Sequence, residues 1–532
     1  MGEHEQLGYE PHPLIGGRGA ALRDLAAWRA GGADAPRVAV ITGSPGCGSS
    51  RLLTGFLMLC DPGYRERIVL ERLDPATVPP PLPAPAVPSA AGRTPAQVLW
   101  LLADHYAFDV ARDAEVYEAL GTAERVVVVP DVAQAGPARA GRGPERMVWE
   151  LLLPLAGIES VRLLAEVPRE EASALASALP AGTVQVIDLD APGYLDVEGL
   201  VLQAEVALDP AFGAPELPFT VDAGARHALA STLAGRAASG GGGSRLTVQL
   251  ATHGWLLAPE PAPRPDVVPG TPAEALDLHA RRLGADPAVL RAILAPLALA
   301  EGEGLPLSLW APLASALAGR DMAAEIADGM LLVGPFVQPV EEGAAEDESE
   351  SESDRDGSGE ALIALAHPAL GETIRARLPD LAAAQLSLAQ ALLGRVPEQN
   401  WSRAAPYVRD GIAGHALGAG QLPRLLSDPS LMAYADPVVL RAAVEEVAAD
   451  EASAAQLPLP ARTYLRTAPL LTRTQADPPL RAKLLAAAFD EDGLAEYAQV
   501  LRARPEFAVP DGRLASTPSP TVPHPTPMET QP

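Results

Sequence analysis

Hydrophobic and polar positions divide the first 210 residues into short strands that alternate with helices. The apolar runs are rich in Val, Ile and Leu, which is typical of strands buried in a parallel sheet. Between them, stretches such as 49–60 carry apolar residues at helical spacing. Strands are expected at 37–42, 68–70, 125–129, 160–167 and 184–189. This alternation predicts a three-layer α/β domain with a parallel sheet over residues 13–210.

Helical patterns dominate the rest of the chain. A Gly-rich stretch at 235–244 predicts a flexible link inside a connecting region, 211–271. Residues 272–378 combine helical patterns with apolar runs at 330–340 and 362–366, which predict a hairpin of strands. The helices of this module are expected at 272–283, 287–299, 307–317 and 322–329.

Three segments lack the apolar residues needed for a core. Residues 341–360 form an acidic run, which predicts a disordered insert in the 272–378 module. Residues 1–12 are mostly polar and 508–532 are rich in Pro, Ser and Thr, so both are expected to be tails. A helical domain is expected over 379–507.

The chain as a whole is acidic. Its formal net charge is −28, with 68 acidic and 40 basic residues. Such a surface repels nucleic-acid phosphates and anionic lipids, so we expect neither as a partner. Lysine occurs only at Lys483, so nearly all positive charge is arginine. The N-terminus is unlike a signal peptide and the apolar runs are too short to span a membrane, which predicts a cytoplasmic protein.

The sharpest motif is a Gly-rich turn between the strand at 37–42 and the helix at 49–60. Its frame is G-x-x-x-x-G-K-[S/T], in which backbone N–H groups and a helix N-terminus surround phosphate oxygens. Ser49 stands where the frame has lysine, and Ser50 stands where a hydroxyl ligates Mg²⁺. Arg51 is the nearest cation that could replace the lysine. The candidate nucleotide-binding residues are Gly43, Ser44, Pro45, Gly46, Cys47, Gly48, Ser49, Ser50 and Arg51.

The order of these features resembles the STAND class of signalling NTPases, in particular the NACHT-like ATPases of actinobacteria. The opening Leu14-Ile15-Gly16-Gly17-Arg18, followed by Leu22, Leu25 and Trp28, is similar to the family's opening motif. In the family, acids that handle magnesium and water follow the next apolar strand. Here that strand is 126–129, and Pro130, Ala133 and Gln134 stand at the acidic positions. Asp131, one residue late, is the candidate magnesium partner beside Ser50.

The resemblance also extends to later parts of the chain. Residues 161–169 are similar to the sensor strand, where Glu166 adds negative charge and Arg169 either reaches the γ-phosphate or lies on the surface. The 272–378 module resembles a winged helix. It ends in His367, which either touches nucleotide or begins a helix.

The residue losses predict a degenerate signalling ATPase that acts as a regulatory or scaffold protein and hydrolyses little or no nucleotide. ATP or ADP is the expected ligand, bound weakly, and the missing acids argue against Mg²⁺. Protein partners and a homo-oligomer are expected. Two alternatives stay open. One is an active, atypical ATPase that uses Arg51 or a partner's arginine, with acid from Asp131 or Glu150. The other is a transcriptional regulator that binds DNA through a winged helix.

Overall fold

The computed structural model describes residues 9–12, 15–32, 35–241, 243–340, 361–448, 457–473, 476–504 and 507. The predicted acidic insert, residues 1–8 of the predicted tail at 1–12, and the predicted tail at 508–532 lie outside the described residues. So does Leu14 of the opening motif. Residues 9–12 are described, and they pack on the domain, with His12 buried.

A parallel sheet organises the N-terminal part of the chain. Its strands are β1 (Val38–Thr42), β2 (Arg125–Val129), β3 (Val161–Glu166) and β4 (Val184–Asp188), in the order β2-β3-β1-β4. Ala86 extends the sheet beyond β2, because its backbone exchanges hydrogen bonds with Val126 and Val128. The strand predicted at 68–70 is wrong, since a 3₁₀ turn, η1 (Leu70–Arg72), lies there.

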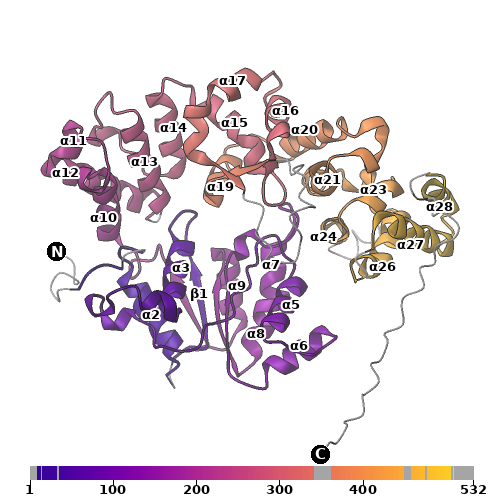
Figure 1. The fold of residues 1–532 in the computed structure, drawn as a ribbon, viewed down its shortest axis with the longest axis horizontal. Helices are drawn as coiled ribbons and strands as arrows, with labels where there is room; N and C mark the ends of the chain where they lie inside the picture. Colours follow the sequence, from indigo (N-terminus) through magenta and orange to yellow (C-terminus); the bar gives the residue numbers. More distant parts are fainter. Residues whose placement is uncertain are drawn as a thin grey trace, which may run out of the picture.

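Helices cover both faces of this sheet (Figure 1). Side chains alternate across each strand, so β1 buries Ala39 and Ile41 on one face and Val38 and Val40 on the other. The first face is covered by α2 (Gly19–Ala30) and α3 (Ser49–Cys60), with the short α4 (Pro62–Arg65) after them. The second face is covered by α5 (Pro95–His105), α6 (Asp113–Leu120), α7 (Gly143–Met147), α8 (Leu153–Gly157) and α9 (Arg169–Ala178). The predicted three-layer α/β architecture is therefore confirmed.

The strand order determines where a ligand crevice can form. The chain leaves β1 into α3 on one face, whereas it leaves the neighbouring strand β3 into α9 on the opposite face. Crevices in open α/β sheets form at such switch points, beyond the carboxyl ends of the strands. The Gly-rich turn after β1 lies at this point.

A separate helical unit follows the sheet. It consists of α10 (Val197–Leu208), α11 (Pro218–Val221), α12 (Ala223–Gly241) and α13 (Arg245–Leu257), which share a core that includes Leu200 and Trp255. The predicted flexible link at 235–244 is wrong for 235–241, which continue α12. Gly240 packs directly on another backbone, because a Cβ there would lie 2.8 Å from the Gly270 carbonyl oxygen. Gly240 therefore permits close packing of α12 on Gly270.

The next module joins helices to a small antiparallel sheet. The sheet order is β5 (Leu305–Pro306), β7 (Leu362–Leu365), β6 (Val337–Val340). The return strand predicted at 362–366 is confirmed. The run at 330–340 is a strand only at its end, because Met330–Val333 form the short helix α18. The other helices are α14 (Pro272–Arg282), α15 (Pro287–Leu299), α16 (Leu307–Ala318), α17 (Ala323–Asp328) and α19 (Pro368–Arg375).

The remaining described chain is helical, as predicted. One hydrophobic core continues from Leu246 to Phe507, so this region packs on the preceding module. The helical modules form an arch over the α/β domain (Figure 1). Within the described residues, none of the helices has the length and apolar character to cross a membrane. The helices here are α20 (Leu381–Leu393), α21 (Pro406–Gly418), α22 (Leu422–Leu425), α23 (Pro429–Tyr434), α24 (Pro437–Val447), α26 (Leu459–Arg473), α27 (Pro478–Glu491) and α28 (Ala495–Arg502).

Candidate phosphate-binding site

The Gly-rich turn has the backbone shape of an anion-binding loop. It leaves β1 at Gly43 and enters α3 at Ser49, and the Cys47 N–H closes a turn on the Ser44 carbonyl at 3.0 Å. Gly46 and Gly48 have φ of 82° and 93°, in the left-handed region that favours glycine. The turn thereby leads into the N-terminus of a 12-residue helix, where free N–H groups attract anions.

Cys47 has a structural role in this loop. Its side chain is buried, and a Cβ on Gly43 would lie 2.7 Å from its sulfur. Burial is the largest effect on the thiol and raises its pKa, so Cys47 lacks the character of a reactive thiolate. Pro45, at the tip of the turn, is exposed.

The carboxylate that contacts the Ser50 hydroxyl belongs to Glu166 and not to Asp131. The Ser50 hydroxyl donates to Glu166 Oε1 at 2.9 Å, and Glu166 ends β3, directly paired with Ile41 of β1. Asp131 adopts a left-handed φ of 61° and its carboxylate accepts from the Ser89 hydroxyl at 2.9 Å. In this structure the left-handed turn directs the Asp131 carboxylate to Ser89 rather than to Ser50, and a role for Asp131 as a magnesium partner stays a prediction.

Burial raises the pKa of Glu166, and the nearby charge of Asp131 raises it further. Hydrogen bonds from Ser49 and Ser50 oppose this shift by stabilising the carboxylate. Glu166 Oε2 is buried and lacks a hydrogen-bond partner among the described residues. A hydroxyl beside a carboxylate is a donor set that suits Mg²⁺, so Ser50 and Glu166 are the residues that could hold one. The described residues contain no group of three His, Cys, Asp or Glu placed to bind a metal.

Arg18 fastens the loop to the rest of the α/β domain. Its guanidinium donates to the carbonyls of Cys47 at 2.7 Å, Leu189 at 2.9 Å and Tyr194 at 3.0 Å, and its side chain is almost fully buried. Its own backbone N–H donates to Asp196 Oδ2 at 2.8 Å. The opening motif thus supports the loop through Arg18.

A carboxylate also binds the first residues of the loop. Asp190 Oδ2 accepts from the Ser44 N–H at 2.6 Å and the Ser44 hydroxyl at 2.7 Å. Arg169 forms ion pairs with Asp190 and, at 2.9 Å, with Asp188. Arg169 had been expected either to reach the γ-phosphate or to lie on the surface. In the structure it lies beside the loop, and its guanidinium is paired with these two carboxylates.

The helical unit lies directly on the loop, a contact that the sequence did not predict. The Leu246 N–H donates to the Gly46 carbonyl at 3.1 Å. A Cβ on Gly48 would lie 2.8 Å from Cδ of Arg245, the first residue of α13. The only signal in the sequence was an arginine two residues after the Gly run at 240–243.

Three other candidates can be placed. Arg51 is exposed in the first turn of α3 and is close enough to Arg245 to lower its pKa. His367 begins α19, where its Nδ1 accepts from the Ala369 N–H at 3.1 Å, so it acts as a helix cap. Glu150 pairs with Arg146 at 2.7 Å on the second face of the sheet, away from the loop.

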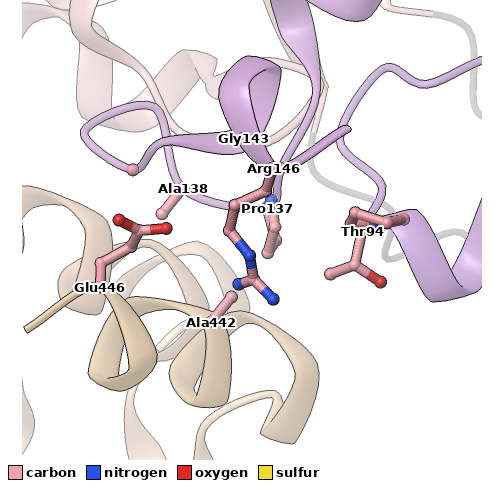
Figure 2. Close-up of a pocket in the computed structure, with 10 residues that line it drawn as sticks. Thr94, Pro137, Ala138, Gly143, Arg146, Ala442 and Glu446 are labelled. Atoms are coloured by element: carbon pink, nitrogen blue, oxygen red, sulfur yellow. The ribbon is translucent and has the colours of Figure 1, made fainter. Parts of the chain in front are cut away.

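A pocket lies between the α/β domain and α24, apart from the Gly-rich loop. Figure 2 shows Arg146 extending toward Ala442 of α24, with Glu446 on one side and Thr94 on the other. Arg146 pairs with Glu445 at 3.1 Å and Arg142 pairs with Glu446 at 3.1 Å, so ion pairs join the two domains here.

Comparison with known proteins adds no assignment to this site: no protein-family model matches the chain, and no curated protein matches it either.

Proposed function

We propose that this chain is a degenerate STAND-type ATPase that serves as a regulatory or scaffold protein and binds a nucleotide without hydrolysing it. The observation that carries the proposal is the contrast within the loop. Its backbone retains the left-handed glycines and the helix N-terminus that favour phosphate. The lysine is replaced by Ser49, and Pro130 stands at the expected metal position.

The replacement of the loop lysine and of the acidic residues should reduce nucleotide hydrolysis more than nucleotide binding. Phosphoryl transfer depends on cations that neutralise developing charge and on a group that positions water. Ser49 offers neutral hydrogen bonding, and neutral hydrogen bonds are about half as strong as charge-assisted ones. Gln134 can orient a water but cannot take its proton. Backbone N–H groups remain, and they support binding without turnover.

The first prediction concerns nucleotide binding by the full chain. We expect calorimetry to detect ADP and ATP binding that changes little with Mg²⁺, and phosphate release at the level of buffer. Gly48→Ala should abolish binding, because φ of 93° strains an alanine and its Cβ would meet Arg245. Gly157→Ala is the matched control, since a Cβ there meets open space. Absence of binding at millimolar nucleotide would contradict the proposal.

An active ATPase is the second candidate, and Glu166 is the observation that favours it. Its carboxylate beside the Ser50 hydroxyl offers the oxygen ligands that Mg²⁺ prefers. In that case phosphate release would require Mg²⁺ and would be lost in Glu166→Gln. Mg²⁺-dependent phosphate release that is lost in Glu166→Gln would replace the proposal of binding without hydrolysis. Nucleotide binding that needs no Mg²⁺ and is unaffected by Glu166→Gln would support that proposal.

DNA binding through the 272–378 module has less support. The arrangement of helices with a three-stranded antiparallel sheet suits a winged helix. However, Arg281, Arg291 and Arg377 are all held in ion pairs with Asp277, and the chain carries a formal net charge of −28, which repels DNA phosphates. We therefore propose that this module contacts protein. A gel shift with duplex DNA at low salt should show no retardation.

A further inference from the structure

Arg245 is a buried cation at the edge of the Gly-rich loop. Only 8% of its side chain is exposed, although arginine is rarely buried without a strong partner. It extends from the first residue of α13 across Gly48. Glycines make room for it, because a Cβ on Gly199 would lie 3.0 Å from its guanidinium.

The acid beside Arg245 is already engaged. Asp196 Oδ2 lies 3.4 Å from the Arg245 guanidinium but accepts from the Arg18 N–H at 2.8 Å, and Oδ1 accepts from the Gly199 N–H at 2.8 Å. The second contact of Arg245, with Gln203 Oε1, is 3.5 Å long. Charge-assisted hydrogen bonds are normally about 2.7–2.9 Å, so Arg245 has capacity for a closer anion.

Other positive groups surround the same point. Burial is the main reason that the pKa of Arg245 falls to about 10, and the charges of Arg18 and Arg51 lower it further. Arg18 Nε is also buried, and it meets no hydrogen-bond partner among the described residues. The N-terminus of α3 adds the positive end of a helix dipole. Repulsion among these groups would be relieved by an anion.

We propose that Arg245 supplies the cation missing at Ser49 and holds a phosphate group of ADP or ATP against the backbone N–H groups of the Gly46–Ser50 turn. This inference rests on the proposed function, whose ligand it specifies. The lysine of the usual frame belongs to the loop itself, whereas Arg245 belongs to the helical unit. A bound phosphate would therefore link α13 to the α/β domain. The helical unit would then contact the ligand directly through Arg245.

The test compares Arg245→Gln with Arg236→Gln in the full chain. Arg236 lies on α12 of the same unit, is exposed, and pairs with Glu274 at 3.8 Å, so its loss is a matched control. Calorimetry with ADP, inorganic pyrophosphate and adenosine separates phosphate from base contacts. We expect Arg245→Gln to weaken ADP and pyrophosphate binding by about 10- to 100-fold, the range for one charged hydrogen bond. Arg236→Gln should bind as the natural chain does.

Arg245→Lys should recover part of the affinity, because it restores the charge without the planar fork. It also serves if the glutamine variant fails to fold, which circular dichroism would reveal. Three outcomes are distinguishable. If the natural chain binds neither ADP nor pyrophosphate, the proposed function itself fails. If it binds them and Arg245→Gln binds equally well or more tightly, the role of Arg245 is overturned while the proposed function stands. Equal binding of adenosine and ADP by the natural chain would also overturn it.

Discussion

Replacing Arg18 with leucine is expected to lower the free energy of opening of the β1 region by about 3–5 kcal/mol, the range for breaking a buried charged network. The substitution leaves the carbonyls of Cys47, Leu189 and Tyr194 without the donor that serves them in the buried interior. Each unsatisfied buried group costs about 1–3 kcal/mol. Removing a buried guanidinium offsets part of the sum. Native-state hydrogen exchange of the amides of 38–42 measures this opening locally, without assuming that the whole chain unfolds at once.

Arg23→Leu is the matched control for this prediction. Arg23 lies on α2, the helix that Arg18 directly precedes, but it is half-exposed and pairs with Asp74 at 3.5 Å. Exposed pairs of this kind contribute about 0–1 kcal/mol, so the exchange of β1 should change little. If the β1 amides of Arg18→Leu exchange as slowly as those of the control, then Arg18 does not hold the loop in place. Its hydrogen bonds would then have been replaced by water.

The regular elements of the α/β domain could be predicted because local patterns specify them. The strands β1 to β4 are short apolar runs, and α3 was predicted with the ends that the structure shows. Two local patterns led to wrong predictions of secondary structure. The apolar run at 68–70 is followed by Glu71 and Arg72, and it pairs with no strand of the part of the chain that the structure describes. The glycines after 235 suggested a break, although their small size is what lets α12 approach Gly270.

The chemistry of the site depends on contacts that no local pattern contains. Glu166 reaches Ser50 because β3 pairs with β1 in the register that sets Glu166 opposite Ile41. Counting residues after 126–129 placed Asp131 one position beyond Pro130, but it could not show that the Asp131 carboxylate turns to Ser89. Arg245 comes from a helix nearly 200 residues after the loop, so only the tertiary structure brings them together.

The loop after β2 carries a second connection between domains. Arg139, in this loop, donates from its backbone N–H to Glu301 Oε2 at 2.9 Å and from its side chain to the Ala300 carbonyl. Glu301 lies at the end of α15, only 4% exposed, and its N–H donates to the Tyr407 hydroxyl at 3.2 Å. The α/β domain, the small-sheet module and α21 therefore meet at one carboxyl group.

Burial raises the pKa of Glu301 from 4.5 to about 7, although hydrogen bonding from Arg139 and the charges of Arg139 and Arg375 lower it. A raised carboxyl pKa means that the folded protein binds the proton more tightly than the unfolded chain does. The stabilisation is fully present below pH 4.5 and is lost as the pH rises to about 7. At about 1.4 kcal/mol per pH unit, the loss amounts to about 3 kcal/mol.

The matched variant is Glu301→Gln, which keeps a neutral group of the same shape at every pH. We expect the free energy of unfolding of the natural chain, relative to this variant, to fall by about 3 kcal/mol between pH 4.5 and pH 8.

The difference is needed because His415, bonded to Tyr407 in the same network, acts in the opposite direction. Burial lowers the pKa of His415 to about 4, so its stabilisation is lost as the pH falls below 6.5 and masks the trend in the natural chain alone. Urea denaturation of both chains across this range provides the measurement. A difference that stays constant with pH would mean that Glu301 keeps one protonation state in the folded protein, and that this junction between the domains does not respond to pH.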